Sequence, residues 1–321
     1  MLITGATGSF GSAFIETLLA RHRLEAIRVY SRDELKQSEL RQRLGEDKRL
    51  RYLIGDVRDL PRLSRAMRGV DVVVHAAALK QVAVCEYNPF EAVQTNVVGA
   101  ENVVAAAIEN DVPLTIALSS DKAVNPVNLY GATKLCAEKI FTQGNAYSGE
   151  SAARFASVRY GNVVGSRGSV VPLFKAAAAT GVVTITDERM TRFWITLPQA
   201  VAFVLESLDR MGGGEIFVPK IPSMRITDIA NVLAPGAEHR LIGIRPGEKL
   251  HEVLLTEDES RHSLEVENGF VILPEYASWP LCEVEDGHAL PPGFRFSSDL
   301  NERWLSADEF EEMAAGVGAA A

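Results

Sequence analysis

The sequence has few cysteines and no long apolar segment. Its 321 residues include only Cys85, Cys136 and Cys282, whose spacing fits neither a metal-binding motif nor a full set of disulfides, so we expect reduced thiols and no metal site. No apolar run reaches the roughly 18 residues of a membrane-spanning helix. The apolar residues 1–3 form far too short a run for a secretory signal. These absences predict a cytoplasmic protein without a membrane segment.

An excess of positive charge is also missing. Lysine and arginine total 33 against 42 acidic residues, and the formal net charge is −9. We therefore do not expect a surface that binds polymeric nucleic acid, although a few arginines can still hold a small anionic ligand. The hydrophobic and charged fractions, 47% and 23%, are ordinary for a folded globular chain.

Short apolar runs alternate with helical stretches through the first half of the chain. Strands are expected at 2–4, 27–30, 51–54, 70–75, 114–119 and 156–160, with helices from about residue 9 and at 33–44, 60–67, 92–110 and 130–144. This alternation predicts an α/β fold with a doubly wound parallel Rossmann sheet. Beyond about residue 165 glycine and proline interrupt the pattern. We expect a cofactor-binding domain at 1–164 and a smaller α/β substrate-binding domain at 165–321, with residues about 193–220 returning to the first.

A glycine-rich turn lies between the first expected strand and the first expected helix. Its three glycines are spaced so that the backbone can turn sharply and approach a pyrophosphate at the helix N-terminus. A tight turn without a ligand is the simpler alternative, but the position in a strand-helix-strand unit favours a dinucleotide site. The cofactor-binding residues expected here are Gly5, Thr7, Gly8, Ser9, Phe10 and Gly11.

The end of the second expected strand carries Ser31 and Arg32, and Lys36 follows. In NAD sites an acidic side chain at this position bonds the ribose 2′-hydroxyl. A hydroxyl and a guanidinium suit the 2′-phosphate of NADP instead. We therefore expect NADP. Asp33 keeps NAD open, and Arg32 and Lys36 could simply pair with Asp33 and Glu39 on a solvated helix.

Tyr130 and Lys134 are four residues apart in an expected helix, so they share one face. A nearby ammonium lowers the pKa of a tyrosine from about 10, which allows the phenolate to act as a base. Asp121 and Lys122 follow the expected strand at 114–119 and are expected in the same cleft. The alternative interpretation is an aromatic residue beside an exposed lysine, with a local ion pair at the strand end.

These residues carry a resemblance to a known family. The glycine turn, His75–Ala78, Asn96, and Tyr130 with Lys134 resemble the extended short-chain dehydrogenase/reductases that act on nucleotide sugars. The segment 119–126 is similar, more narrowly, to the inverting UDP-N-acetylglucosamine 4,6-dehydratases of pseudaminic acid biosynthesis. The likeness extends to residues 31–37, 75–81, 159–163, 190–194, 245–251 and 297–305. Related dehydratases of deoxythymidine-diphosphate glucose carry glutamate where this chain has Lys122.

The resemblance implies a redox-neutral dehydration. Tyr130 would deprotonate the C4 hydroxyl while hydride passes from C4 to NADP. Lys122, alone or together with Tyr130, would remove the C5 proton, and Asp121 would protonate the departing C6 hydroxyl. Hydride would return to C6, and protonation of C5 from the opposite face would leave an inverted UDP-4-keto-6-deoxy sugar. A neutral Lys122 requires a lowered pKa, for which burial or Lys134 is a candidate.

Further contacts are expected around this centre. For the cofactor they are Asp56, Val57, Ala76, Ala77, Lys80, Ser119, Tyr130 and Lys134. For the UDP-sugar they are Lys80, Ser120, Asn162, Arg192, Arg245 and Glu248. Arginine forks match phosphate oxygens, although each arginine could also be solvated at the surface.

Three other functions remain open from the sequence. A nucleotide-sugar 4-epimerase uses the same tyrosine and lysine, but Asp121 and Lys122 speak against it. Dehydratases that retain C5 resemble this chain, yet they are commonly membrane-anchored and carry methionine in place of Tyr130. A catalytically silent Rossmann protein that binds NADP is the non-enzyme alternative. The resemblance further implies a homo-oligomer that serves glycosylation of flagellin or another surface glycan.

Overall fold

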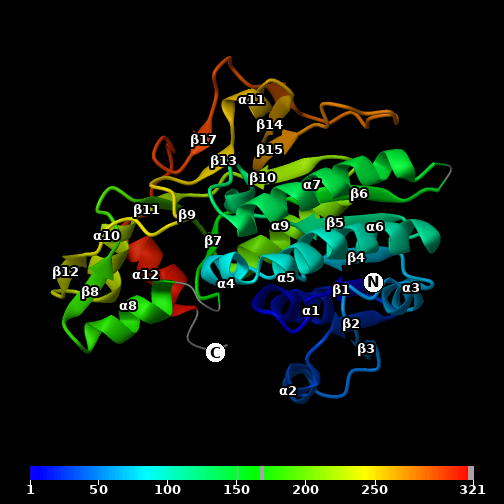
Figure 1. Ribbon diagram of the computed structural model, residues 1–321, viewed down its shortest axis with the longest axis horizontal. Helices are drawn as coiled ribbons and strands as arrows, with labels where there is room; N and C mark the ends of the chain where they lie inside the picture. The colour runs from blue at the N-terminus through cyan, green and yellow to red at the C-terminus, as the bar shows by residue number, and fades with distance from the viewer. Residues whose placement is uncertain (150, 167–169, 317–321) are drawn as a thin grey trace.

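The fold is built on a ten-stranded sheet (Figure 1). The computed structural model describes residues 1–149, 151–166 and 170–316. Seven neighbouring strands are parallel and run in the order β3-β2-β1-β4-β5-β6-β10. They are β1 (Leu2–Thr4), β2 (Ile27–Ser31), β3 (Leu50–Ile54), β4 (Val72–His75), β5 (Leu114–Leu118), β6 (Arg154–Val158) and β10 (Ile216–Pro219). The predicted doubly wound parallel sheet is confirmed.

The sheet also takes strands from the part of the chain expected in the smaller domain. Beyond β10 it continues antiparallel with β15 (Gly269–Ile272), β14 (Ser263–Val266) and β16 (His288–Ala289). A two-residue turn at 267–268 joins β14 to β15 as a hairpin. The large sheet therefore takes strands from beyond residues 193–220, because a strand can join a sheet edge from anywhere in the sequence.

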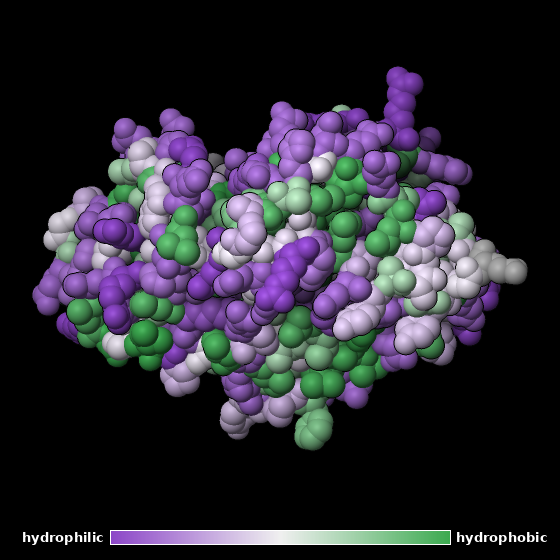
Figure 2. Space-filling model, turned by 90° about the horizontal axis from the view of Figure 1, so that it is seen from above, coloured by the Kyte–Doolittle hydropathy of each residue, from purple (hydrophilic) through white to green (hydrophobic). Residues whose placement is uncertain are grey.

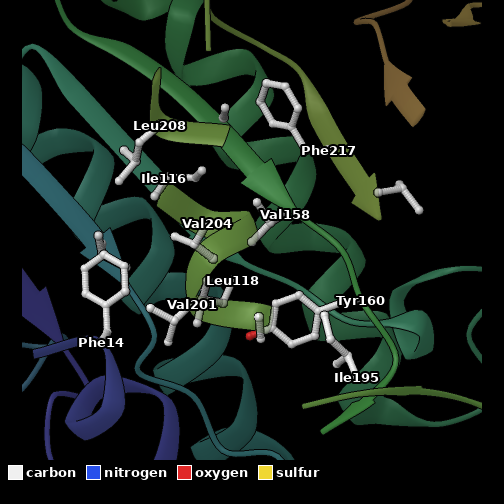
Figure 3. Packing of buried hydrophobic residues seen from close by; sticks show 14 of the residues in the cluster. Phe14, Ile116, Leu118, Val158, Tyr160, Ile195, Val201, Val204, Leu208 and Phe217 are labelled. Carbon is white, nitrogen blue, oxygen red and sulfur yellow. The ribbon is translucent and has the colours of Figure 1, made fainter. Parts of the chain in front are cut away.

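Helices cover both faces of the sheet. On one face α1 (Ser9–Arg21) packs beside α9 (Leu197–Arg210), and on the other lie α3 (Leu60–Met67), α6 (Gly99–Glu109) and α7 (Leu129–Tyr147). Helix α2 (Glu34–Leu44) follows β2. Figure 3 shows Val201, Val204 and Leu208 of α9 against Ile116 and Val158 of the sheet. The three α9 residues are spaced to lie on one helix face, so α9 completes the core.

One expected helix is divided. In place of a continuous helix over 92–110, the chain forms α5 (Pro89–Val93), a π-helical turn (Gln94–Val98) and α6. Asn96 lies in the π-helical turn, where its side chain accepts from the Leu79 N–H over 2.8 Å and donates to the Leu79 carbonyl over 2.9 Å. The wider turn thus accompanies a side-chain clamp on the loop after β4, which hydrophobic periodicity does not reveal.

A second group of elements lies to one side of the sheet (Figure 1). It has its own buried cluster, which includes Trp194, Met224 and Phe310. Its elements are α8 (Val170–Ala178), β8 (Val182–Ile185), α10 (Ile226–Leu233), β12 (Glu238–Leu241) and α12 (Ala307–Ala315). Short sheets connect it to the rest through β7 (Asn162–Val163), β9 (Thr191–Ile195), β11 (Ser223–Arg225), β13 (Val253–Leu255) and β17 (Phe296–Ser297). Strand β9 pairs with β7 and β11, whereas β10 joins the large sheet.

The face of the molecule in Figure 2 is mostly hydrophilic, with apolar side chains in separate patches. Across the described ranges, no helix has both the length and the apolar character needed to cross a membrane.

Candidate active site

The glycine turn between β1 and α1 has the shape that a pyrophosphate requires. Gly5 has a φ of +63°, and a Cβ there would lie 2.7–2.8 Å from the backbone of Ala76 and Ala77. Gly11 approaches the preceding turn equally closely. Helix α1 begins after Gly8 with no side-chain cap and no acidic residue in its first turn. Its first N–H groups therefore suit a phosphate, and the residues present fit a dinucleotide.

The residues at the end of β2 are arranged around the carboxylates of Asp33 and Asp56. Asp33 caps α2 by accepting from the Lys36 N–H over 3.0 Å, and its other oxygen lies 3.0 Å from Lys36 Nζ. These bonds hold the pKa of Asp33 below its ordinary value. Arg32, half exposed, lies 3.6 Å from Asp56. The Ser31 hydroxyl accepts from Gln37, which leaves its proton available to a ligand.

Beyond β5 and β6 the chain forms the buried centre of the site. The Asp121 N–H donates to the Tyr160 carbonyl over 3.1 Å, and a 3₁₀ turn (Asp121–Ala123) follows. Asp121 Oδ1 accepts from the Ser120 hydroxyl over 2.6 Å and from Lys122 Nζ over 3.0 Å. Asp121 Oδ2 is buried and has no hydrogen-bond partner among the described atoms. Burial alone raises the pKa of this carboxyl, but Lys122 and Ser120 outweigh burial and lower it.

Lys122 is an ammonium between two carboxylates. Its Nζ lies 3.0 Å from Asp121 Oδ1 and 3.7 Å from Glu252 Oε1. Burial alone lowers the pKa of Lys122, but the two carboxylates reverse this and raise the pKa above its ordinary value. The sequence-based expectation that the Lys122 pKa falls is therefore wrong, because Asp121 raises it most and Glu252, which is remote in the sequence, raises it further.

Glu252 is a site residue that sequence reasoning missed, whereas Lys249 belongs to the turn at 245–249 that was expected to contact the substrate. Glu252 directly precedes β13 and is 3% exposed. Besides Lys122, its carboxylate lies 3.7 Å from Arg192 Nε and 3.7 Å from Lys249 Nζ. Lys249 Nζ also donates to the Val124 carbonyl over 2.5 Å. The three-residue spacing of Lys249 and Glu252 was the one feature of the sequence that could have indicated their ion pair.

Tyr130 and Lys134 lie on the same face of α7, as predicted, and both are buried. Burial raises the pKa of Tyr130 to about 12, with Lys122 lowering it and Asp121 raising it. Burial also lowers the pKa of Lys134 to about 8, and its Nζ donates to the Leu118 carbonyl over 2.7 Å. The expectation that Lys134 lowers the tyrosine pKa is therefore wrong, because desolvation dominates and the opposing cation is Lys122.

The start of α7 is joined to the turn that carries Arg245 and Glu248. Asn128 Oδ1 accepts from the Gly131 N–H over 2.8 Å and caps the helix, while Asn128 Nδ2 donates to the Gly247 carbonyl over 2.7 Å. Arg245 and Glu248 lie 3.6 Å apart, and Arg245 is largely exposed. This turn, Lys249 and α7 are therefore held against one another.

The chain is similar to known proteins over most of its length. Residues 1–274 match the family described as polysaccharide biosynthesis protein. The chain belongs to this family. It is 52% identical to a UDP-N-acetylglucosamine 4,6-dehydratase (inverting) of Campylobacter jejuni, over 98% of this chain and 96% of the relative. A UDP-glucose 4-epimerase of Rickettsia conorii is 44% identical over 81% of this chain and 78% of its own. The X-ray structure of Pen from Bacillus thuringiensis has a TM-score of 0.90 at 38% identity, covering 98% and 96% of the two chains.

An ion cluster around the buried Arg159 extends the face of α7 that carries Tyr130 and Lys134. Glu138 is one turn beyond Lys134 and lies 2.7 Å from Arg159, which also lies 3.0 Å from Glu259. Arg159 further donates to the Leu254 carbonyl over 2.9 Å. Helix α7, β13 and α11 (Glu257–Ser260) are therefore fixed relative to each other.

The remaining expected site residues lie on β7 and on the segments that follow β3, β4 and β5. Asn162 is on β7 opposite Trp194 of β9, the strand that carries Arg192, and its amide donates to the Phe193 carbonyl over 3.4 Å. Lys80 follows Leu79, the residue clamped by Asn96. Val57 is buried after β3, and the hydroxyl of Ser119 is buried without a partner among the described atoms.

Proposed function

We propose that the protein is an NADP-dependent UDP-N-acetylglucosamine 4,6-dehydratase that inverts C5. The observation that carries the proposal is the hydrogen-bonded pair of buried Asp121 and partly buried Lys122 next to Tyr130. The sequence identity to the Campylobacter jejuni enzyme supports the same reaction.

Tyr130 is the base for the C4 hydroxyl in this proposal. Its phenol is buried, so its pKa of about 12 must fall when it acts, and the Lys122 ammonium is the protein cation that favours the phenolate. A nicotinamide cofactor held at the glycine turn would supply the hydride acceptor for C4 and the hydride donor for C6. Lys134 hydrogen-bonds the Leu118 carbonyl at the end of β5 and is expected to meet the cofactor ribose.

Asp121 and Lys122 together supply the acid and the base for elimination. Transfer of one proton from Lys122 Nζ to Asp121 across their 3.0 Å hydrogen bond yields a neutral amine and a carboxylic acid. The amine takes the C5 proton, and the acid protonates the C6 hydroxyl, which leaves as water. The pair then returns to ammonium and carboxylate, so protons balance. Tyr130 releases to solvent the proton it took from the C4 hydroxyl, and one solvent proton delivered to C5 from the opposite face completes the inversion, so the overall proton count is unchanged.

NADP preference rests on Ser31, Arg32 and Lys36. Asp33 is already engaged by the helix cap and by Lys36, which removes the free carboxylate that a 2′-hydroxyl site uses. Arg32 is half exposed and oriented by Asp56, where it can bind a 2′-phosphate. The remaining cofactor contacts are those expected from the sequence at the glycine turn, residues 56–57 and residues 76–80.

For the UDP-sugar we propose Arg192 and Arg245 at the diphosphate and uridine, with Glu248, Asn162, Ser120 and Lys80 as further contacts. Arg192 donates to the carbonyls of Thr191 and Leu250, at 2.7 and 3.1 Å, which fixes its guanidinium beside the catalytic pair. A guanidinium group that is already held in place loses less conformational entropy when it binds an anion.

A 4-epimerase is the second candidate, because a family relative bears that name at 44% identity. Epimerisation at C4 needs Tyr130 and the cofactor but no acid and base for C6 and C5. Mass spectrometry after incubation with UDP-N-acetylglucosamine distinguishes the two. The dehydratase yields a product lighter by one water, whereas an unchanged mass with a new C4 epimer indicates the epimerase, and no new sugar indicates a silent NADP-binding protein.

We further propose a homo-oligomer that supplies a precursor of pseudaminic acid for flagellin or another surface glycan, on the sequence resemblance alone. Sedimentation that yields a monomer would contradict the first part.

A further inference from the structure

Glu252 is a buried carboxylate that takes no direct part in the proposed reaction. It contacts three cations at 3.7 Å, yet its Oε2 has no hydrogen-bond partner among the described atoms. Its backbone N–H donates to the Ser298 hydroxyl over 2.9 Å, which fixes the residue in place. A carboxylate buried in this way is costly unless cations compensate it. The cluster therefore couples the charge of Glu252 to that of Lys122.

We propose that Glu252 is a positioning residue that holds Lys122 as an ammonium beside Tyr130 and directs the later proton transfer to Asp121. This role rests on the proposed dehydratase reaction. Before C4 oxidation, Lys122 must be charged to favour the Tyr130 phenolate, and two carboxylates within 4 Å maintain that charge. At elimination Lys122 must release a proton to one of these two carboxylates.

The surroundings of the two carboxylates decide which one receives the proton. Glu252 keeps Arg192 and Lys249 as cationic neighbours after Lys122 is neutralised, so its ionised form stays compensated. Asp121 accepts the Lys122 hydrogen bond directly at 3.0 Å, whereas the Lys122–Glu252 separation of 3.7 Å exceeds a hydrogen bond. The proton therefore passes to Asp121, the group that the reaction needs as an acid.

Charged and titratable groups from several elements face Lys122 and influence its charge. These groups are Asp121 on its own turn, Glu252 before β13, Arg192 on β9, Lys249 on the preceding turn and Tyr130 on α7.

The experiment measures the charge of Lys122 directly and needs no turnover. Wild-type protein, Glu252→Gln and Glu252→Asp are treated with a trace of an amine-acylating reagent at several pH values, and modification of Lys122 is quantified by mass spectrometry against exposed Lys48. Only the neutral amine reacts. Loss of one carboxylate charge at this distance lowers the lysine pKa by about one unit, so Lys122 in Glu252→Gln is acylated about tenfold faster. Glu265→Gln is the control, because Glu265 is a half-exposed carboxylate on β14 that pairs with Lys220.

Glu252→Asp restores the charge, and its Lys122 labelling is expected to return toward the wild-type rate. Equal Lys122 labelling in wild type and Glu252→Gln would overturn the proposal. Glu252→Asp labelling as fast as Glu252→Gln would also overturn it, because the change would then reflect access instead of charge. If Lys122 labelling differs between wild type and Glu252→Gln as expected, but wild type does not dehydrate UDP-N-acetylglucosamine, the charge coupling stands and the proposed function is refuted.

Discussion

Gly131 lies directly against the backbone of Lys122. A Cβ at Gly131 would overlap the Lys122 carbonyl oxygen, so only glycine lets the first turn of α7 approach the 3₁₀ turn that carries the acid and base. The absence of a Cβ at position 131 therefore allows Tyr130 and Lys122 to lie close together.

Substitution Gly131→Ala is expected to push α7 away from this turn. We expect kcat to fall at least about tenfold and the free energy of unfolding to fall by about 1–3 kcal/mol, because an inserted methyl group forces backbone shifts. Steady-state kinetics and urea unfolding measure both. Gly316→Ala is the matched control, since its nearest obstacle is 3.8 Å away. Wild-type kcat in Gly131→Ala would show that the contact is dispensable.

The acid and the base can be removed singly. Asp121→Asn cannot protonate the C6 hydroxyl, and Lys122→Met can neither take the C5 proton nor favour the Tyr130 phenolate. Each is expected to lower product formation at least about hundredfold. In Asp121→Asn the absorbance of reduced nicotinamide should persist, because hydride has left C4 but cannot return at C6. Near-normal turnover by either variant would refute the assigned roles.

The proposed preference for NADP over NAD depends on Arg32. Arg32→Ala removes a charged hydrogen bond to the 2′-phosphate, which is worth about 1.5–3 kcal/mol. The Kd of NADP should therefore rise roughly tenfold or more, while that of NAD changes little. Calorimetric titration gives both constants, with Arg43→Ala as a control arginine that pairs with Glu16. Equal weakening of NADP and NAD would refute the 2′-phosphate assignment.

Burial of Lys134 predicts a pH-dependent stability. Its pKa in the folded protein is about 8, below the ordinary 10.5. Between these pH values the unfolded chain holds a proton that the folded protein lacks, so this lysine makes the free energy of unfolding rise with pH in that window. The rise is at most about 3 kcal/mol. Lys134→Met should lack it when urea unfolding is compared across the window. Parallel pH curves for the two proteins would contradict the assignment.

The sequence predicts the strands, the glycine turn and the shared face of Tyr130 and Lys134, because each depends on local spacing. It does not predict the Lys122–Glu252 pair, which joins residues far apart in the chain. Nor does it predict that burial sets the pKa of Tyr130, since desolvation depends on the whole surrounding fold. The strands β14 to β16 were missed for a similar reason, because sheet-edge pairing is not a local property.

Incubation with UDP-N-acetylglucosamine in deuterated water, followed by proton NMR of the sugar, tests the proposed dehydration directly. An inverting dehydratase forms a 4-keto-6-deoxy product with deuterium at C5 and the coupling of the inverted configuration. A C4 epimer, or a dehydrated product that retains the original C5 configuration, would contradict the proposed function.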